Sequence, residues 1–129
     1  MKRHAQLQDL SREHHGALKL ARAARHAAES GAADQLATQA RRVAQTFAAE
    51  LDPHFRVEEQ GILPLLTQAG EHALVQRTQD EHAELRRLVA ALSRPDSATL
   101  SRFAELLAAH VRFEERELFE AAQDKMPFG

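Results

Sequence analysis

The chain has 129 residues, 43% of them hydrophobic and 28% charged, and this balance predicts one domain over residues 1–129 with a buried core. The formal net charge is only -2 and both signs are scattered along the chain, which argues against a nucleic-acid partner. No stretch approaches the roughly 20 apolar residues of a membrane span, and residues 1–6 lead into no apolar run of signal-peptide length. We therefore expect a cytoplasmic protein with no membrane partner.

The spacing of apolar residues predicts four helices, and the first of them covers residues 7–29. A second helix begins near Asp34, a suitable N-cap residue, and ends at Gly70. Pro53 interrupts this second helix and removes one of its backbone hydrogen bonds. The proline therefore predicts a kink directly beside His54.

The third helix is predicted over residues 71–93, and residues 94–97 then mark a turn and a helix cap. A fourth helix with the same apolar spacing continues to about Gln123. No segment shows the alternation of apolar and polar residues that is typical of a strand. The sequence therefore predicts an all-α fold, an up-down-up-down four-helix bundle with short loops.

Two segments of the chain are near copies of each other, HFRVEEQGIL at residues 54–63 and HVRFEERELF at residues 110–119. Each copy begins with a histidine that is followed four residues later by a glutamate. On a helix this spacing stacks the imidazole and the carboxylate on one face, about 6 Å apart along the axis. Such a face is typical of a pair of metal ligands.

A shorter repeat precedes each of these segments, with Glu13-His14 in one copy and Glu81-His82 in the other. Both histidines fall on the apolar side of their helices, which predicts that they point into the bundle. His15 shares its face with polar residues, so we favour His14 over His15 as the inward histidine and expect His15 at the surface or beside the ligands.

The buried polar residues point to a metal site, because an unpaired carboxylate in a bundle core costs several kcal/mol. Cysteine is absent, so any metal must use nitrogen and oxygen ligands. Four imidazoles and two carboxylates are too many for one tetrahedral zinc, and imidazole suits neither magnesium nor calcium. Two first-row ions fit better, with both glutamates shared and an oxo or hydroxo bridge offsetting the metal charge. The predicted metal ligands are His14, His54, Glu58, His82, His110 and Glu114.

These residues and the two long repeats resemble the hemerythrin-like, histidine-histidine-glutamate cation-binding domains. The resemblance covers residues 11–119 and includes Ile62-Leu63-Pro64 after the first long repeat. It implies a four-helix bundle around two iron ions, a non-haem di-iron centre in which Glu58 and Glu114 bridge and the four histidines are terminal ligands. It also implies reversible chemistry with dioxygen. Ferritin-like bundles would instead need Glu-x-x-His pairs on inward faces.

One position departs from that family, because oxygen-carrying hemerythrins have a further histidine where this chain has Thr78, one turn before His82. Threonine is a poor iron ligand, so the second iron would be more open and simple oxygen transport is less expected. The leading hypothesis is a module that binds or senses dioxygen or a related small ligand. The alternatives are a di-iron enzyme that acts on peroxide or nitric oxide, and a storage or structural site for iron or zinc. No motif identifies a protein partner.

Three further acidic residues lie close to the predicted ligands. Glu117 follows Glu114 by three residues and is the best candidate for an extra ligand, although we favour a site without it. Glu59 and Glu115 each follow a predicted ligand by one residue and should point about 100° away from it. We expect these two on a solvated face, paired with arginines such as Arg56 or Arg112.

Overall fold

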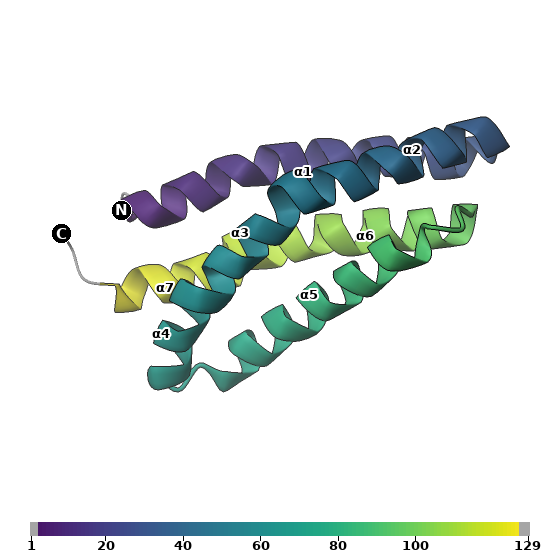
Figure 1. Ribbon diagram of the computed structural model, residues 1–129. Coiled ribbons are helices and arrows are strands. Elements are labelled where there is room, and N and C mark those ends of the chain that lie inside the picture. The colour runs from purple at the N-terminus through teal and green to yellow at the C-terminus, as the bar shows by residue number, and fades with distance from the viewer. Residues whose placement is uncertain (1–2, 127–129) are drawn as a thin grey trace.

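Four long helical runs make up the computed structural model, which describes residues 3–126 (Figure 1). The runs alternate in direction, so that both ends of the described chain lie at the same end of the bundle. This arrangement confirms the predicted all-α, up-down-up-down fold. The runs are α1 (Ala5–Ser30), then α2 (Ala33–Thr46), η1 (Phe47–Leu51), α3 (Asp52–Val57), η2 (Glu58–Ile62) and α4 (Leu63–Gln68), then α5 (His72–Ala91), and finally α6 (Ser97–Phe113), η3 (Glu114–Leu118) and α7 (Phe119–Lys125).

The ends of the runs follow the turn and capping residues of the sequence. Gly31 and Gly70 adopt φ angles of 65° and 84°, a left-handed conformation that glycine takes without strain. Asp96 caps α6, and its carboxylate accepts a hydrogen bond from a backbone N–H three residues later. The prediction that Asp34 caps the second run is wrong. Asp34 lies in the first turn of α2, and the N-cap position is Ala32.

The second run contains two π-helical turns, each of which ends two residues before a proline. The segment η1 precedes Pro53 and the segment η2 precedes Pro64. In η1 the N–H of Asp52 bonds to the carbonyl of Phe47, five residues earlier, as a widened turn requires. The predicted irregularity beside His54 is therefore a π turn ahead of the proline. Figure 1 shows the second run bending along α3 and α4.

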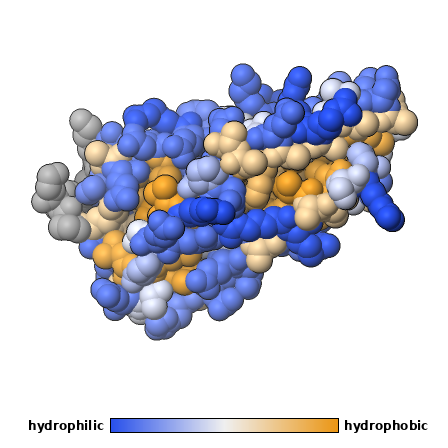
Figure 2. Space-filling view, in the orientation of Figure 1, coloured by the Kyte–Doolittle hydropathy of each residue, from blue (hydrophilic) through white to orange (hydrophobic). Residues whose placement is uncertain are grey.

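Two apolar clusters fill the interior of the bundle, and a polar layer separates them. One cluster surrounds Leu7, Phe113 and Phe119, near the ends of the described chain. The other surrounds Leu88 and Phe103 and extends to the α1–α2 and α5–α6 loops. On the face shown in Figure 2, hydrophilic residues alternate with apolar side chains that reach the surface between them. Among the helices of residues 3–126, none has the length and the apolar character that a membrane span requires.

Candidate metal centre

All six predicted ligands lie in the polar layer and are withdrawn from solvent. Each of the four helical runs contributes a histidine, and the second and fourth runs also contribute a glutamate. The relative exposures are 4% for His14, 4% for His54, 0% for Glu58, 0% for His82, 1% for His110 and 0% for Glu114. All six side chains are therefore almost fully buried in the layer between the two apolar clusters.

The six side chains form two groups that share both glutamates. His14 and His54 belong to one group and His82 and His110 to the other, and within each group the ligand atoms lie within 4.8 Å of one another. Each carboxylate places one oxygen near each group. The separations are 3.0 Å from Glu58 Oε2 to His54 Nε2, 3.0 Å from Glu58 Oε1 to His82 Nε2, 2.7 Å from Glu114 Oε1 to His14 Nε2 and 3.0 Å from Glu114 Oε2 to His110 Nε2.

Four further glutamates contact the other nitrogen of each imidazole. In every case the glutamate comes from a neighbouring helical run, and the four contacts close a ring: the first run supports the second, the second the third, the third the fourth, and the fourth the first. The four Nδ1–carboxylate distances are 2.6 Å for His54–Glu13, 2.7 Å for His82–Glu59, 2.7 Å for His110–Glu81 and 2.7 Å for His14–Glu115.

This ring decides which imidazole nitrogen carries the proton. An ionised carboxylate only accepts hydrogen bonds, so each Nδ1–H donates to its outer glutamate. In a neutral imidazole the Nε2 atom then presents a lone pair, and all four Nε2 atoms face carboxylate oxygens that also only accept. The Nε2 atoms of His54, His82 and His110 and both oxygens of Glu58 are buried without a hydrogen-bond partner. Positive charge between these atoms would satisfy them, and nitrogen and oxygen donors of this kind fit first-row metal ions.

Without metal, protons would supply that charge. The pKa values of two of the buried imidazoles are raised, so these imidazoles hold an extra proton more tightly than usual. Burial lowers the pKa of His54, but the hydrogen bonds and charges of Glu114 and Glu58 outweigh burial and raise it to about 11. Burial is likewise outweighed at His110, where the charge of Glu114 raises the pKa to about 10. Burial raises the pKa of Glu58, and the neighbouring charge of Glu114 raises it further. The site therefore binds protons tightly when no metal is bound.

The π turns begin at the two inner glutamates. The segment η2 starts at Glu58 and the segment η3 at Glu114, and π turns often occur at functional sites. In each turn two consecutive glutamates hold the two nitrogens of one imidazole, Glu58 and Glu59 on His82 in the first case and the corresponding pair on His14 in the second. The ring orientation of these two histidines is thus fixed from one short segment of backbone.

A family model for the hemerythrin HHE cation-binding domain matches residues 6–122, which is most of the chain. The chain belongs to this family. The match confirms the resemblance that the two long repeats indicated. Neither a curated protein nor a solved structure shows significant similarity to the chain. Hemerythrin HHE domains bind metal cations, and the two shared His/Glu groups are where this chain can hold them.

The expectation that Glu59 and Glu115 lie on a solvated face of the HHE domain is wrong. Besides its imidazole, Glu59 contacts Arg86 at 2.8 Å and Glu115 contacts Arg3 at 2.6 Å, so neither pairs with an arginine of its own helical run. Burial raises the pKa of both carboxyls, but these hydrogen bonds outweigh it and lower the pKa, which keeps the acceptors ionised. The supporting role of Glu13 and Glu81 was not predicted, although the repeated Glu-His dipeptide contained the signal.

The remaining candidates are not members of either His/Glu group of the HHE domain. His15 is exposed whereas His14 is buried, which confirms the preference for His14 as the inward residue. Thr78 is buried one turn before His82, but its hydroxyl donates a hydrogen bond to the carbonyl of Leu74 at 2.8 Å. The side chain of Glu117 is 55% exposed and belongs to neither His/Glu group.

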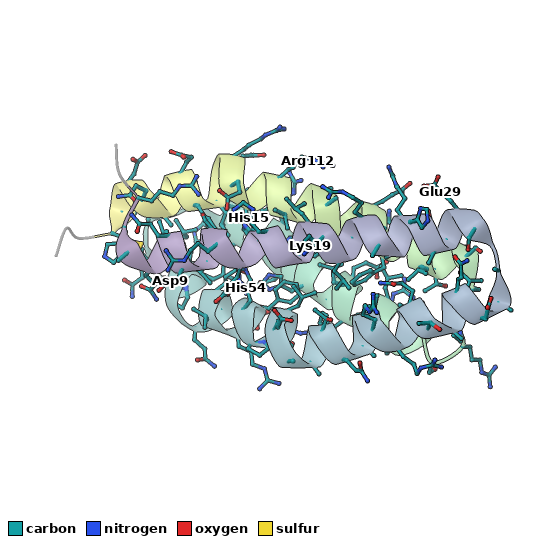
Figure 3. The ribbon with its side chains drawn as sticks, turned by 90° about the horizontal axis from the view of Figure 1, so that it is seen from above. Asp9, His15, Lys19, Glu29, His54 and Arg112 are labelled. Atoms are coloured by element: carbon teal, nitrogen blue, oxygen red, sulfur yellow. The ribbon has the colours of Figure 1, made fainter. Side chains whose placement is uncertain are left out.

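A pocket of about 270 Å³ lies beside the centre, between α1 and the η1–α3 segment. Its wall includes His14, His54 and His110, so it touches both His/Glu groups. Figure 3, which looks onto α1, shows His54 between α1 and the helix that carries it. Aromatic rings cover other parts of the centre: Phe55 stacks on His82 at 3.9 Å between ring centroids, and Phe119 stacks on His14 at 5.2 Å.

Replacing Glu81 with alanine is expected to weaken metal binding about 10- to 100-fold, because His110 loses the acceptor that orients its ring. Competition with a coloured chelator measures the affinity. Glu84→Ala is the matched control, since Glu84 lies on the same helix and pairs with Arg87 at the surface. Equal affinities for the two variants would contradict the orienting role of Glu81.

Metal binding is expected to release protons at neutral pH. With pKa values of about 11 and about 10, His54 and His110 carry a second proton at pH 7 when no metal is bound, and Nε2 must lose it to coordinate. The apparent affinity should therefore rise with pH. Calorimetric titrations in two buffers of different ionisation enthalpy measure the protons released. Identical binding enthalpies in both buffers would show that none are released.

Proposed function

We propose that this HHE domain holds two iron ions between its two His/Glu groups and binds dioxygen or a related small ligand there. One observation carries the proposal: each inner carboxylate, Glu58 and Glu114, directs one oxygen to each group. A carboxylate that serves two groups in this way fits a bridging ligand between two ions. The two-histidine composition of each group then supplies the terminal ligands.

The donor set supports two ions rather than one. A single tetrahedral ion would use four donors and would leave two buried histidines aimed at carboxylates without a cation. Two divalent ions offset the charge of both glutamates, and imidazole with carboxylate is a ligand set that iron uses. Thr78 adds no donor to the second group, because its hydroxyl is engaged with the backbone. Each iron would have two imidazoles and two shared carboxylates, which leaves coordination positions free.

When bound between the two groups, a pair of iron(II) ions would supply two electrons and open positions for a small ligand. The protein supplies the surroundings that such chemistry needs. Glu13, Glu59, Glu81 and Glu115 fix the four imidazole rings, which limits reorganisation of the ligands. Phe55 and Phe119 cover two of these rings and exclude water from their faces. The pocket on the side of His54 provides a route for the ligand.

Two other functions of the same centre differ from this proposal in measurable ways. A di-iron enzyme would consume peroxide or nitric oxide continuously when a reductant is present, whereas a binding module would not. A storage or structural site would hold zinc or iron without a response to oxygen. We favour binding because it requires only the donor set and the pocket that reaches it.

The metal content and near-ultraviolet spectrum of protein purified from its host test the proposal. We expect two irons per chain and charge-transfer bands that bleach on anaerobic reduction and return in air. The absence of tyrosine and tryptophan makes these bands easy to see. Zinc alone, with no uptake of iron on reconstitution, would contradict the proposal, and sustained peroxide consumption would favour the enzyme.

Removal of one shared carboxylate tests the bridge itself. We expect Glu58→Ala and Glu114→Ala to lose the paired-iron spectrum and to retain at most one iron per chain. The control is Glu117→Ala, which removes an exposed carboxylate from the same π turn as Glu114. Circular dichroism checks that each variant keeps its helices. Two irons in both carboxylate variants would rule out the bridging assignment.

A further inference from the structure

We propose that the pocket beside the centre is a binding site for an uncharged, mostly apolar organic molecule, which it holds against the imidazoles of His14, His54 and His110. This inference deepens the proposed function by naming a second class of ligand for the same site. Binding in the pocket itself does not require a metal ligand, because protein side chains form its walls.

The size of the pocket exceeds the need of a diatomic ligand. Its volume is about 270 Å³. One water molecule occupies about 30 Å³ in the liquid, and an apolar cavity of about 150 Å³ holds one benzene molecule. The pocket therefore has room for a molecule larger than benzene, beside the face where a metal-bound ligand would sit.

The pocket leads from the surface to the centre. Gly16, Ala49 and Val57 line it and are exposed, whereas Leu107 and Val111 line it with exposures of only 1% and 2%. Val57 is 43% exposed. Among residues 3–126 it is the one large apolar residue that is exposed to solvent. Its position extends the apolar wall outward to the rim. An apolar molecule could thus contact protein along the whole depth of the pocket.

Gly16 keeps one wall of the pocket recessed. It lies in the interior of α1, where glycine destabilises a helix relative to alanine. A Cβ atom built at this position meets no other atom within 4 Å, so close packing does not require glycine there. Ala49, which also lines the pocket, is small as well. The helix therefore gives up stability at a point where a larger side chain would fill the pocket.

The charges around the pocket select against anions. Glu13 and Glu50 lie on its exposed side, and no lysine or arginine is among the described residues that line it. An anion entering between these carboxylates would meet repulsion at the exposed side of the pocket before it reached the imidazoles. At the inner end of the pocket, metal ions held by the two His/Glu groups would repel a cationic ligand. An uncharged molecule avoids both penalties.

Titration with toluene and with benzoate tests the proposal in metal-free and in metal-loaded protein. We expect saturable binding of toluene in both forms, with methyl shifts in metal-free protein at Val57, Leu107 and Val111 and none at Val75 in the other apolar cluster. Benzoate should bind about tenfold more weakly or not at all. No saturable toluene binding, or equal binding of benzoate, would overturn the proposal. A protein that takes up no iron on reconstitution but still binds toluene would instead contradict only the proposed function.

Two filling variants localise the site. Ala49→Leu and Gly16→Leu should each weaken toluene binding about tenfold or more, because a leucine side chain occupies the volume of the ligand. Ala48→Leu is the matched control: Ala48 is also exposed and lies in the same π turn as Ala49, but it does not line the pocket. Gly16→Leu should also raise the denaturation midpoint, which separates lost binding from unfolding. Unchanged toluene binding in both filling variants, or equal loss in the control, would overturn the proposal.

Discussion

The structure depends on one electrostatic constraint: six buried side chains direct electron pairs, rather than donors, toward one small volume. Leaving charges such as Glu58 and Glu114 uncompensated in the interior costs several kcal/mol each. Cations or protons must therefore occupy that volume in the folded state. Because the six residues come from all four helical runs, whatever supplies the charge also ties the runs together. Metal binding and folding of the bundle are consequently linked.

The ring of outer glutamates carries this link from the centre to the helix surfaces. Each imidazole accepts a cation at Nε2 and donates at Nδ1 to a glutamate of another run, so a stronger Nε2–metal bond makes Nδ1–H a better donor. Three of the outer carboxylates also contact an arginine: Glu59 contacts Arg86, Glu81 contacts Arg77, and Glu115 contacts Arg3. Glu13 instead lies on the wall of the pocket, with its side chain 56% exposed. The support of His54 is thus the part of the ring that a molecule in the pocket can reach.

The bundle and the inner residues could be predicted because their signals are local. A spacing of three and four residues defines each helix, and a histidine four residues before a glutamate places both on one face. Glu59 and Glu115 were misplaced because the rule of 100° per residue assumes an ideal α-helix, whereas π turns begin at the residues before them. The pairing of Glu13 with His54 joins two helical runs and depends on their packing, which spacing within one helix does not specify.

The pocket shows why the same sequence pattern does not define a ligand. Glu58 and Glu114 would be placed alike in a domain whose centre is closed on every side, and only the side chains between α1 and α3 decide whether a molecule can approach. At Gly16 the chain keeps a residue that weakens its longest α-helix, although the space beside it would accept a side chain. Stability alone would favour a larger residue there. The open volume beside His54 is what the proposed apolar ligand would occupy, and under that proposal the walls of the pocket would select the ligand as much as the metal ligands do.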